Sequence, residues 1–522
     1  MYKNIVVFFV FLIYLGIGCS IYTDYGISWD EPQSRMNGEV NLKYVSQHLA
    51  PSWSVGKFNN TPDLQQWVDR DYGVAFELPL YIIEKLAKPL DDRNAFLLRH
   101  LITFLFSALG VWCLYKIVDL RFQDWRLGIL AASLLILTPR FFGEAFYNSK
   151  DIVFMAAFLM ATYTMYRYVI HPSLKTAFIH SFATAFATDV RIIGCSILLL
   201  TFVASFCTLR TLKLNRVVQL NFAYAIFTGL FIIAMFPLLW SSPIENFIGA
   251  FKAMMNFRWD LNVLYLGEQI NAKKLPWHYI IVWILITTPI MYLVLFVTGV
   301  IASIRSLGRV VQKRKVLATE DILDGLALVI FFGPILAGIV LKSTFYDGWR
   351  QMYFIYPSFL ILSISGFKSV YVALTRAIYR NTFLLVIACS LAHHTYVIFQ
   401  THPLQSLYFN QLAGSDWRKS FEIDYWGLAN KKALQYILDH DSRTHVSVST
   451  DSATPLSLSL MMIDPIQAPR ISLVDPSHDA DYLVTNYRMT NTSDEKYLNT
   501  HTIFHQIKVM NEVVLTIYKL KN

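Results

Sequence analysis

Two adjacent carboxylates, Asp30 and Glu31, directly follow the first apolar stretch of the chain, in the run Ser-Trp-Asp-Glu-Pro. A carboxylate beside a low-dielectric boundary holds a proton more readily than one in water, so it can act as a general base. The same residues also fit a helix start, because Asp30 would be the N-cap and Pro32 would lie in the first turn. The two roles are compatible, and we predict a base candidate at the start of a helix.

A second polar cluster lies in a short connection between two later apolar stretches. It holds Arg140, Glu144, Asn148, Lys150 and Asp151. Asp151 could instead cap the following helix, and Arg140 could mark a membrane interface. Ionisable groups at membrane depth are costly and usually line a cavity. We therefore interpret this dense polar connection as the lining of a cavity that contains a second acidic group.

Basic side chains follow in three other connections. Arg258 and Lys273 lie in a long loop, Arg350 ends the run Tyr-Asp-Gly-Trp-Arg, and Asp189 and Arg191 are expected to form an internal ion pair. Arginine and lysine bind phosphate, and a guanidinium adds bidentate contacts. Singly, each of these residues is more often an interface anchor. Together with the carboxylates they predict a pocket that holds an anionic head group beside a base.

Long apolar stretches separate these polar groups. Hydrophobic residues make up 55% of the 522 residues and charged residues only 16%, which is too little polar surface for a soluble chain of this length. About 20 apolar residues cross the hydrocarbon core of a bilayer. We predict about eleven crossings, at Ile5–Tyr22, Phe96–Val118, Leu127–Thr138, Ile152–Ile170, Ala177–Thr188, Ile192–Thr208, Val217–Trp240, Tyr279–Ile304, Ile322–Leu341, Met352–Tyr371 and Thr382–Phe399.

The basic residues are concentrated in the short connections on one side. These connections are at Lys3 and at residues 121–126, 167–175, 210–216, 305–315 and 376–380. The positive-inside rule assigns them to the cytoplasm, which places the N-terminus inside and the C-terminus outside. The net charge of +9 is therefore a topology signal, and we expect no nucleic-acid partner.

From about residue 400 the chain changes to mixed charge and alternating apolar residues. His445–Ser449 and Val513–Tyr518 favour strands, and Lys431–Asp439 favours a helix. We predict an α-helical polytopic membrane protein with a large first outward loop and a small α/β C-terminal outer domain. Its two domains are a transmembrane domain over residues 1–400, with outward loops 23–95 and 241–278, and an extracytoplasmic domain over residues 401–522.

Four stretches resemble the GT-C superfamily of polytopic glycosyltransferases. They are Ser28–Pro32, Pro139–Asp151, Asp347–Arg350 and His402–Gly427. The resemblance is to the bacterial branch similar to glycosyltransferase family 39, which is related to protein O-mannosyltransferases and to the lipid A aminoarabinose transferase. An acidic pair after the first crossing and a second Asp after the third are its specific part.

The resemblance implies a hexosyl- or pentosyltransferase in a bacterial inner membrane. Such an enzyme moves a sugar, with inversion, from a polyprenyl-phosphate-linked donor to a lipid, glycan or protein acceptor on the outer face. Asp30 would be the base, Glu31 its neighbour, and Asp151 a second acid that orients the acceptor or a divalent metal. The residues expected to bind substrate or its phosphate are Arg140, Lys150, Arg258, Lys273 and Arg350.

Two alternatives stay open at this point. A multi-pass transporter or flippase of a lipid-linked glycan would need ionisable residues deep within the crossings and inverted repeats, and the apolar stretches are mostly bare of such charge. A ligase that joins a whole lipid-linked glycan to its acceptor would share the polar cluster. A polyprenyl-diphosphate donor would distinguish that ligase from a transferase of single sugars.

Overall fold

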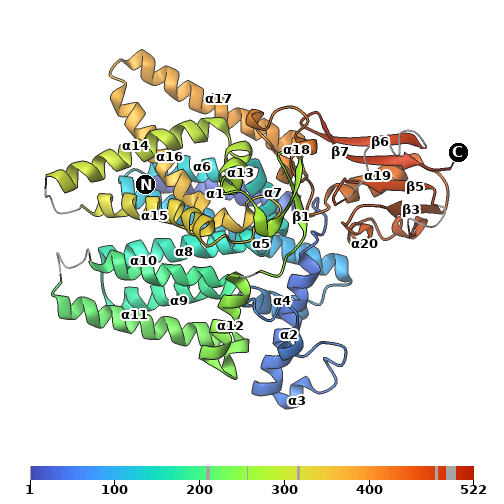
Figure 1. Ribbon diagram of the computed structural model, residues 1–522, viewed down its shortest axis with the longest axis horizontal. Coiled ribbons are helices and arrows are strands. Elements are labelled where there is room, and N and C mark those ends of the chain that lie inside the picture. Colours follow the sequence, from blue (N-terminus) through green and yellow to red (C-terminus); the bar gives the residue numbers. More distant parts are fainter. Residues whose placement is uncertain are drawn as a thin grey trace.

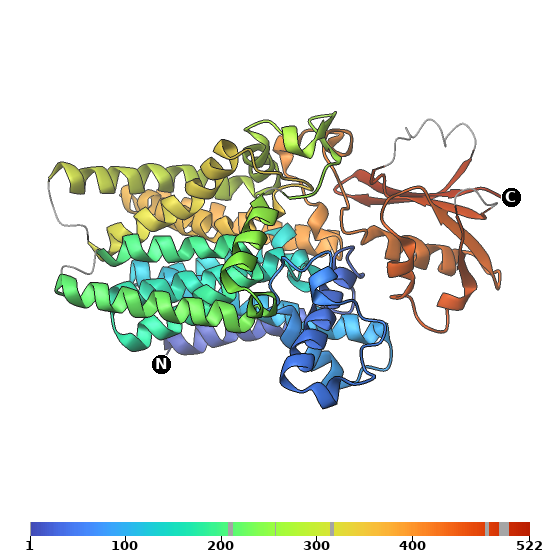
Figure 2. The same ribbon diagram turned by 60° about the horizontal axis from the view of Figure 1, so that its bottom comes forward.

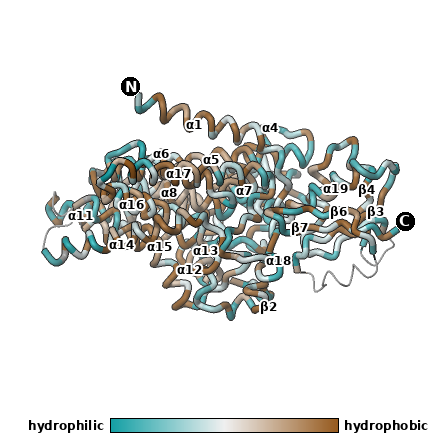
Figure 3. Tube along the Cα trace, turned by 90° about the horizontal axis from the view of Figure 1, so that it is seen from above, coloured by the Kyte–Doolittle hydropathy of each residue, from teal (hydrophilic) through white to brown (hydrophobic). Residues whose placement is uncertain are grey.

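The computed structural model of the chain describes residues 2–206, 212–255, 257–313, 318–475, 480–489 and 501–521. Arg210 and Lys315, which belong to two of the basic connections, lie outside these residues. Long helices run side by side along the long axis of the molecule, and a β-sheet lies at one end of this bundle (Figures 1 and 2). Apolar residues dominate the bundle, and polar and apolar residues mix in the sheet region (Figure 3).

The predicted crossing Tyr279–Ile304 is not one continuous helix, because α13 (Tyr279–Thr287) ends before the main helix begins at Ile290. Each of the eleven predicted apolar stretches overlaps one main bundle helix. These helices are α1 (Tyr2–Ile21), α5 (Asp92–Phe122), α6 (Trp125–Ile136), α8 (Asp151–Ile170), α9 (Leu174–Val190), α10 (Ser196–Ser205), α11 (Leu214–Met235), α14 (Ile290–Gln312), α15 (Thr319–Val340), α16 (Tyr356–Ala373) and α17 (Ala377–Thr401).

The described residues hold eight helices long and apolar enough to cross a membrane, rather than the predicted eleven. A ninth results if α6 and α7 (Pro139–Tyr147), which are bent by 72° at their junction, count as one span. The three short helices are α6, α9 and α10. Pro139 ends α6 because proline cannot continue a helix that reaches it, and Ile192–Cys195 form a 3-10 turn (η2) that delays the start of α10.

The loops predicted to be outward carry short elements that lie around one end of the bundle. From the first loop these are α2 (Glu31–Leu49), α3 (Pro51–Ser54), η1 (Leu64–Gln66) and α4 (Glu77–Ala87). From the later loops they are α12 (Pro243–Met255), β1 (Asn262–Tyr265), β2 (Glu268–Asn271), η5 (Ala272–Lys274) and η6 (Arg350–Ile355). Two more, η4 (Pro237–Trp240) and α13 (Tyr279–Thr287), come from the ends of the predicted crossings Val217–Trp240 and Tyr279–Ile304.

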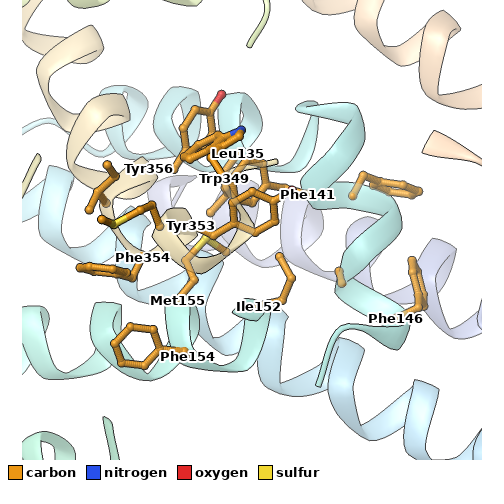
Figure 4. Packing of buried hydrophobic residues seen from close by; sticks show 14 of the residues in the cluster. Leu135, Phe141, Phe146, Ile152, Phe154, Met155, Trp349, Tyr353, Phe354 and Tyr356 are labelled. Carbon is orange, nitrogen blue, oxygen red and sulfur yellow. The ribbon is translucent and has the colours of Figure 1, made fainter. Parts of the chain in front are cut away.

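Aromatic packing joins α7 to η6 and the start of α16. The centroid of the Phe141 ring lies 4.4 Å from that of Tyr353 and 4.4 Å from that of Tyr356, and the Phe141 and Tyr356 rings are stacked (Figure 4). Phe154 and Phe354 extend this packing to α8, with ring centroids 5.1 Å apart. These contacts hold the segment before Asp151 against the segment that begins with Arg350.

The predicted α/β region is confirmed in the C-terminal part. Its elements are η7 (Gln405–Leu407), η8 (Gln411–Ala413), α18 (Trp417–Ser420), α19 (Ala429–His440), β3 (Val446–Thr450), α20 (Leu456–Leu460), η9 (Ala468–Arg470), β4 (Ile471–Leu473), β5 (Tyr482–Thr485), β6 (Thr502–Val509) and β7 (Glu512–Lys519). The sheet order is β4-β3-β5-β7-β6. β3 pairs in parallel with β4 and β5, and β7 pairs antiparallel with β5 and β6.

The segment between α17 and α19 packs back onto the bundle. The Asn410 side chain donates hydrogen bonds to the carbonyl oxygens of Leu285 and Thr288, each at 2.6 Å. The Phe409 ring stacks on Trp417 at 4.5 Å and contacts Trp283 at 5.7 Å. The C-terminal part is therefore fixed against the end of the bundle that carries Asp30, which we call the Asp30 end.

Candidate active site

Asp30 lies at a junction of the first loop, η6 and the C-terminal part. It occupies the N-cap position of α2, but its side chain makes no capping hydrogen bond. Instead, Oδ1 accepts a hydrogen bond of 2.7 Å from the Tyr425 hydroxyl, and Oδ2 lies 3.6 Å from Arg350 Nη1. Proline in the first turn begins the helix without a side-chain cap, so the Asp30 carboxylate faces the junction.

Asp151 forms the buried centre of the cluster. Its carboxylate makes an ion pair with Arg350, at 2.9 Å from Nη1, and a second with Arg191. Its backbone N–H donates to the Asn148 side chain at 2.8 Å, so Asn148 caps the start of α8. The Asp151 side chain is therefore free of a capping role and holds two guanidinium groups in place.

Glu31 is adjacent to Asp30 in the sequence but faces away from it into the protein. One carboxylate oxygen accepts a hydrogen bond of 2.6 Å from the Ser28 N–H, and the other lies 2.9 Å from His100 Nε2. Only 3% of the Glu31 side chain is exposed, compared with 22% for Asp30. Glu31 thus fixes the turn that presents Asp30.

A cleft of about 480 Å³ opens beside Asp30. Arg191, Arg350, Lys150 and Arg258 all line it. Three of these, Lys150, Arg258 and Arg350, were predicted to bind substrate or its phosphate, and the structure brings all three to this cleft. The Lys150 ammonium lies over the Tyr72 ring, 4.7 Å from its centroid. Arg258 pairs with Asp69 and donates to the Val68 carbonyl at 2.6 Å, so both cations are anchored at the rim.

Two predicted basic residues lie outside this cleft. Arg140 is packed behind it, where Nε donates to the Tyr408 carbonyl at 2.9 Å and the guanidinium lies 4.7 Å from the Phe409 ring centroid. Lys273 pairs with Asp260 at 2.8 Å and lines a separate cavity of about 350 Å³. The structure therefore does not bring Arg140 or Lys273 together with Asp30.

The predicted ion pair between Asp189 and Arg191 is wrong. Arg191 turns to Asp151, and the Asp189 carboxylate accepts a hydrogen bond of 2.5 Å from the Ala75 N–H. The reason is the break between α9 and η2, which directs the two side chains to different neighbours. Arg191 is thus a site residue. Its position two residues after Asp189 favours a local ion pair, but its partner in the structure is Asp151.

Two site residues from the C-terminal part also escaped the sequence analysis. Tyr425 lies in the stretch His402–Gly427, which carries the resemblance, but the resemblance implies no role for it. No motif in the sequence around Arg488 marks it as a site residue. Arg488 pairs with Asp347 at 2.5 Å and with Glu422 at 2.7 Å. Its guanidinium lies 5.4 Å from the Tyr425 ring centroid. Arg488 therefore ties the Tyr425 segment to the loop that precedes Arg350.

Buried carboxyl groups support the Tyr425 segment from behind. Burial, followed by the nearby Asp347 carboxylate, raises the pKa of Glu422 well above its ordinary value. Burial also raises the pKa of Asp424 to about 6, although Asn486 and backbone N–H groups donate to it. Both groups therefore favour the protonated form more than exposed carboxyl groups do.

The residues around Asp151 do not fit a divalent metal. Both carboxylate oxygens already face guanidinium groups, and a cation there would repel Arg191 and Arg350. Across the described ranges, no group of three or more His, Cys, Asp or Glu is placed to hold a metal ion. We therefore derive no step through a metal.

Comparisons with known proteins agree with this architecture. Residues 80–240 match the sequence family described as dolichyl-phosphate-mannose-protein mannosyltransferase. No curated protein sequence matches the chain. Among solved structures, ArnT from Cupriavidus metallidurans in the apo state is 11% identical, with a TM-score of 0.50, and the match covers 98% of this chain and 97% of that one.

Two further structures are similar at lower scores. ArnT from Cupriavidus metallidurans bound to undecaprenyl phosphate is 11% identical, with coverage of 100% and 99% and a TM-score of 0.48. Arabinofuranosyltransferase AftD from Mycobacteria is 12% identical, with coverage of 98% of this chain and 41% of that one and a TM-score of 0.42. The helical bundle, the C-terminal sheet and the match over residues 80–240 agree with the resemblance seen in the sequence: this chain is a multi-pass membrane protein whose fold is similar to that of ArnT.

Proposed function

We propose that this chain transfers a sugar from a polyprenyl-phosphate-linked donor to an acceptor hydroxyl at the Asp30 end. The observation that carries the proposal is the contrast among the three acidic candidates. Asp30 is 22% exposed and lines the cleft, whereas the Glu31 and Asp151 side chains are 3% and 0% exposed. Asp30 is thus the carboxylate that an incoming hydroxyl can reach.

The charges around the cleft support a phosphate leaving group. Arg350 and Arg191 are held by Asp151, and Lys150 and Arg258 are anchored at the rim. Positioned cations stabilise negative charge that develops in a transition state. The family matched over residues 80–240 is named for a dolichyl-phosphate-linked mannose donor, which is a sugar on a lipid phosphate. Such a donor accounts for both the cations and the membrane location.

The reaction we propose is a single displacement with inversion. Asp30 takes the proton of the acceptor hydroxyl while the hydroxyl oxygen bonds to the anomeric carbon. The bond between that carbon and the phosphate oxygen breaks, and the lipid phosphate leaves with the electron pair. A general base positioned in this way contributes about 10²–10⁴-fold to the rate. We further propose that the Asp30 end faces outward and that the C-terminal part forms a separate domain there.

The test measures release of polyprenyl phosphate from proteoliposomes that contain the full chain. A panel of polyprenyl-phosphate-linked hexoses and pentoses serves as donor, with cell-envelope extract as the source of acceptor. Asp30→Asn should lower release by about 10²–10⁴-fold, with unchanged yield of folded protein. The matched control is Asp63→Asn, because Asp63 lies in the same loop with a 63% exposed side chain; it should retain the native rate.

Three outcomes would contradict the proposal. Native release by Asp30→Asn would show that another group is the base. Turnover only with polyprenyl-diphosphate-linked glycans would favour the ligase. Movement of a lipid-linked glycan across the bilayer without release of the lipid phosphate would favour the flippase.

A further inference from the structure

A further charged cavity, of about 740 Å³, lies at the opposite end of the bundle. It is bounded by the end of α5, the last turns of α14 and α16 and the first turns of α15, which together we call the basic end. The ion pair between Lys3 and Asp119, at 3.0 Å, places the start of α1 at this same end. The proposed sugar transfer uses no residue here.

Cations predominate in the lining of this cavity. Arg121 makes a bidentate pair with Asp324, through hydrogen bonds of 2.7 Å and 2.6 Å. Asp324 is the one acid among the described residues that line the cavity, and this pair neutralises it. Arg305, Arg309 and Lys368 also line the cavity, and the part of the chain that the structure describes offers none of them an ion pair. Three positive charges therefore converge from α14 and α16 without a counter-charge.

Close packing fixes the backbones of the two helices that carry these cations. A Cβ atom on Gly299 would lie 1.8 Å from the Leu362 carbonyl oxygen, and one on Gly366 would lie 2.0 Å from the Leu295 carbonyl oxygen. Such contacts require glycine on both helices and bring α14 and α16 together. Arg305 and Lys368 follow these two glycines, so their spacing is set by a rigid crossing.

A topology signal alone would not produce this arrangement. The positive-inside rule needs only net positive charge in the connections, whereas here the charges lie on helices and share one cavity with hydroxyl groups such as Ser365. Exposed apolar side chains run along α14 from the cavity toward the other end of the bundle: Ile304 is 55% exposed, Ile301 44% and Val297 55%. The cavity thus combines a cationic lining with an exposed apolar flank.

We propose that this cavity binds the phosphate of an anionic membrane lipid in the leaflet at the basic end. Basic cavities between membrane-spanning helices suit lipid head groups. Arginine supplies bidentate contacts to phosphate oxygens, and lysine supplies a point charge. The exposed apolar flank accommodates acyl chains, which a free phosphate lacks. The proposal is independent of the sugar transfer and stands whether or not Asp30 is a catalytic base.

The test measures lipid binding to the purified full chain in neutral detergent by native mass spectrometry. Phosphatidylglycerol is the probe, and phosphatidylcholine, whose head group has no net charge, is the comparison. The double variant Arg305→Gln/Lys368→Gln should lower the affinity for phosphatidylglycerol about tenfold or more, because two of the three unpaired cations are removed. It should leave the Arg121–Asp324 pair and the thermal unfolding temperature unchanged.

The matched control is Arg216→Gln, because Arg216 is an exposed cation in the first turn of α11, outside this cavity. It should lower the affinity less than twofold. An equal loss in the control would overturn the proposal in favour of general surface charge, as would an unchanged affinity in the double variant. Displacement of phosphatidylglycerol by millimolar inorganic phosphate would also overturn it, since the ligand would then be free phosphate.

Discussion

The two ends of the bundle use arginine in opposite ways. At the Asp30 end, Arg350 is 5% exposed and contacts both Asp30 and Asp151, and Asp151 also holds Arg191. At the basic end, Arg305 and Lys368 are exposed and have no acidic partner within the described residues. The Asp30 end therefore holds Arg350 and Arg191 in a buried, paired array, whereas the basic end, apart from the Arg121–Asp324 pair, leaves its cations open.

This difference has a physical cause and a functional meaning. Burying a charge is strongly unfavourable unless it is paired and hydrogen-bonded. Buried charged groups are therefore stable only where the fold gives each of them a partner, and groups of this kind cluster at catalytic sites. Open cations suffer no such penalty and remain available for reversible binding. Three substitutions can break or sharpen this contrast.

The largest effect is expected for Arg350→Ala. Removal of one partner from a buried ion pair costs about 3–5 kcal/mol of stability, because Asp151 loses the contact at 2.9 Å. Sugar transfer should fall at least about 10²-fold, since a positioned cation is lost. Arg350→Lys keeps the charge but not the planar fork, so its effects should be intermediate. Thermal unfolding in detergent and release of polyprenyl phosphate measure the two effects.

The control for this prediction comes from the other end. Arg305→Gln removes an exposed charge, so stability should change by less than about 0.5 kcal/mol and sugar transfer should stay at the native rate. If the Arg350 and Arg305 variants lost stability equally, the contrast between the two ends would be wrong.

An intermediate effect is expected for Asp424→Asn, and it depends on pH. Burial raises the pKa of Asp424 from 3.8 to about 6, so between these values the folded chain holds a proton that the unfolded chain has released. Stability should therefore fall as the pH rises through this window, by about 3 kcal/mol in total. Asparagine does not ionise, so the stability of the variant should not show this fall between pH 4 and pH 6.

The measurement is the unfolding temperature at pH 4 and pH 7 for the native chain and the variant. Asp416→Asn, at a side chain that is 66% exposed, should follow the native curve. If the unfolding temperature changed equally between pH 4 and pH 7 for Asp424→Asn and the native chain, Asp424 would ionise normally in the folded state and the prediction would be wrong.

The smallest effect is expected for Tyr425→Phe. The change removes the hydroxyl that donates to Asp30 at 2.7 Å but keeps the ring that packs on the Arg350 guanidinium, 4.4 Å away. Loss of a hydrogen bond to a charged group corresponds to about tenfold in rate. Sugar transfer should fall by that amount with little change in the unfolding temperature.

Tyr168→Phe is the matched control, because the Tyr168 hydroxyl donates to Asn221 at 2.9 Å, away from the cleft. It removes one phenol hydrogen bond without touching Asp30, so transfer should be unchanged. A native rate for Tyr425→Phe would mean that the C-terminal part does not position the base.

Much of the fold could be predicted because bilayer solvation acts on local sequence. A run of about 20 apolar residues is a local property, and so the main bundle helices and their order followed from the chain alone. The α/β alternation after residue 400 is local as well, and α19, β3 and β7 lie where the pattern places them. The short helices α6, α9 and α10 limited the prediction, because proline and polar residues shorten them.

The roles within the site were decided by tertiary structure. Asp30 and Glu31 are adjacent and chemically alike, yet only Asp30 reaches the cleft, because Glu31 is turned toward His100. The Tyr425 hydroxyl contacts Asp30 across 395 positions of sequence. Sequence alone determined which residue types flank the apolar stretches. Which of them meet, and which are exposed, depends on long-range packing that no local pattern encodes.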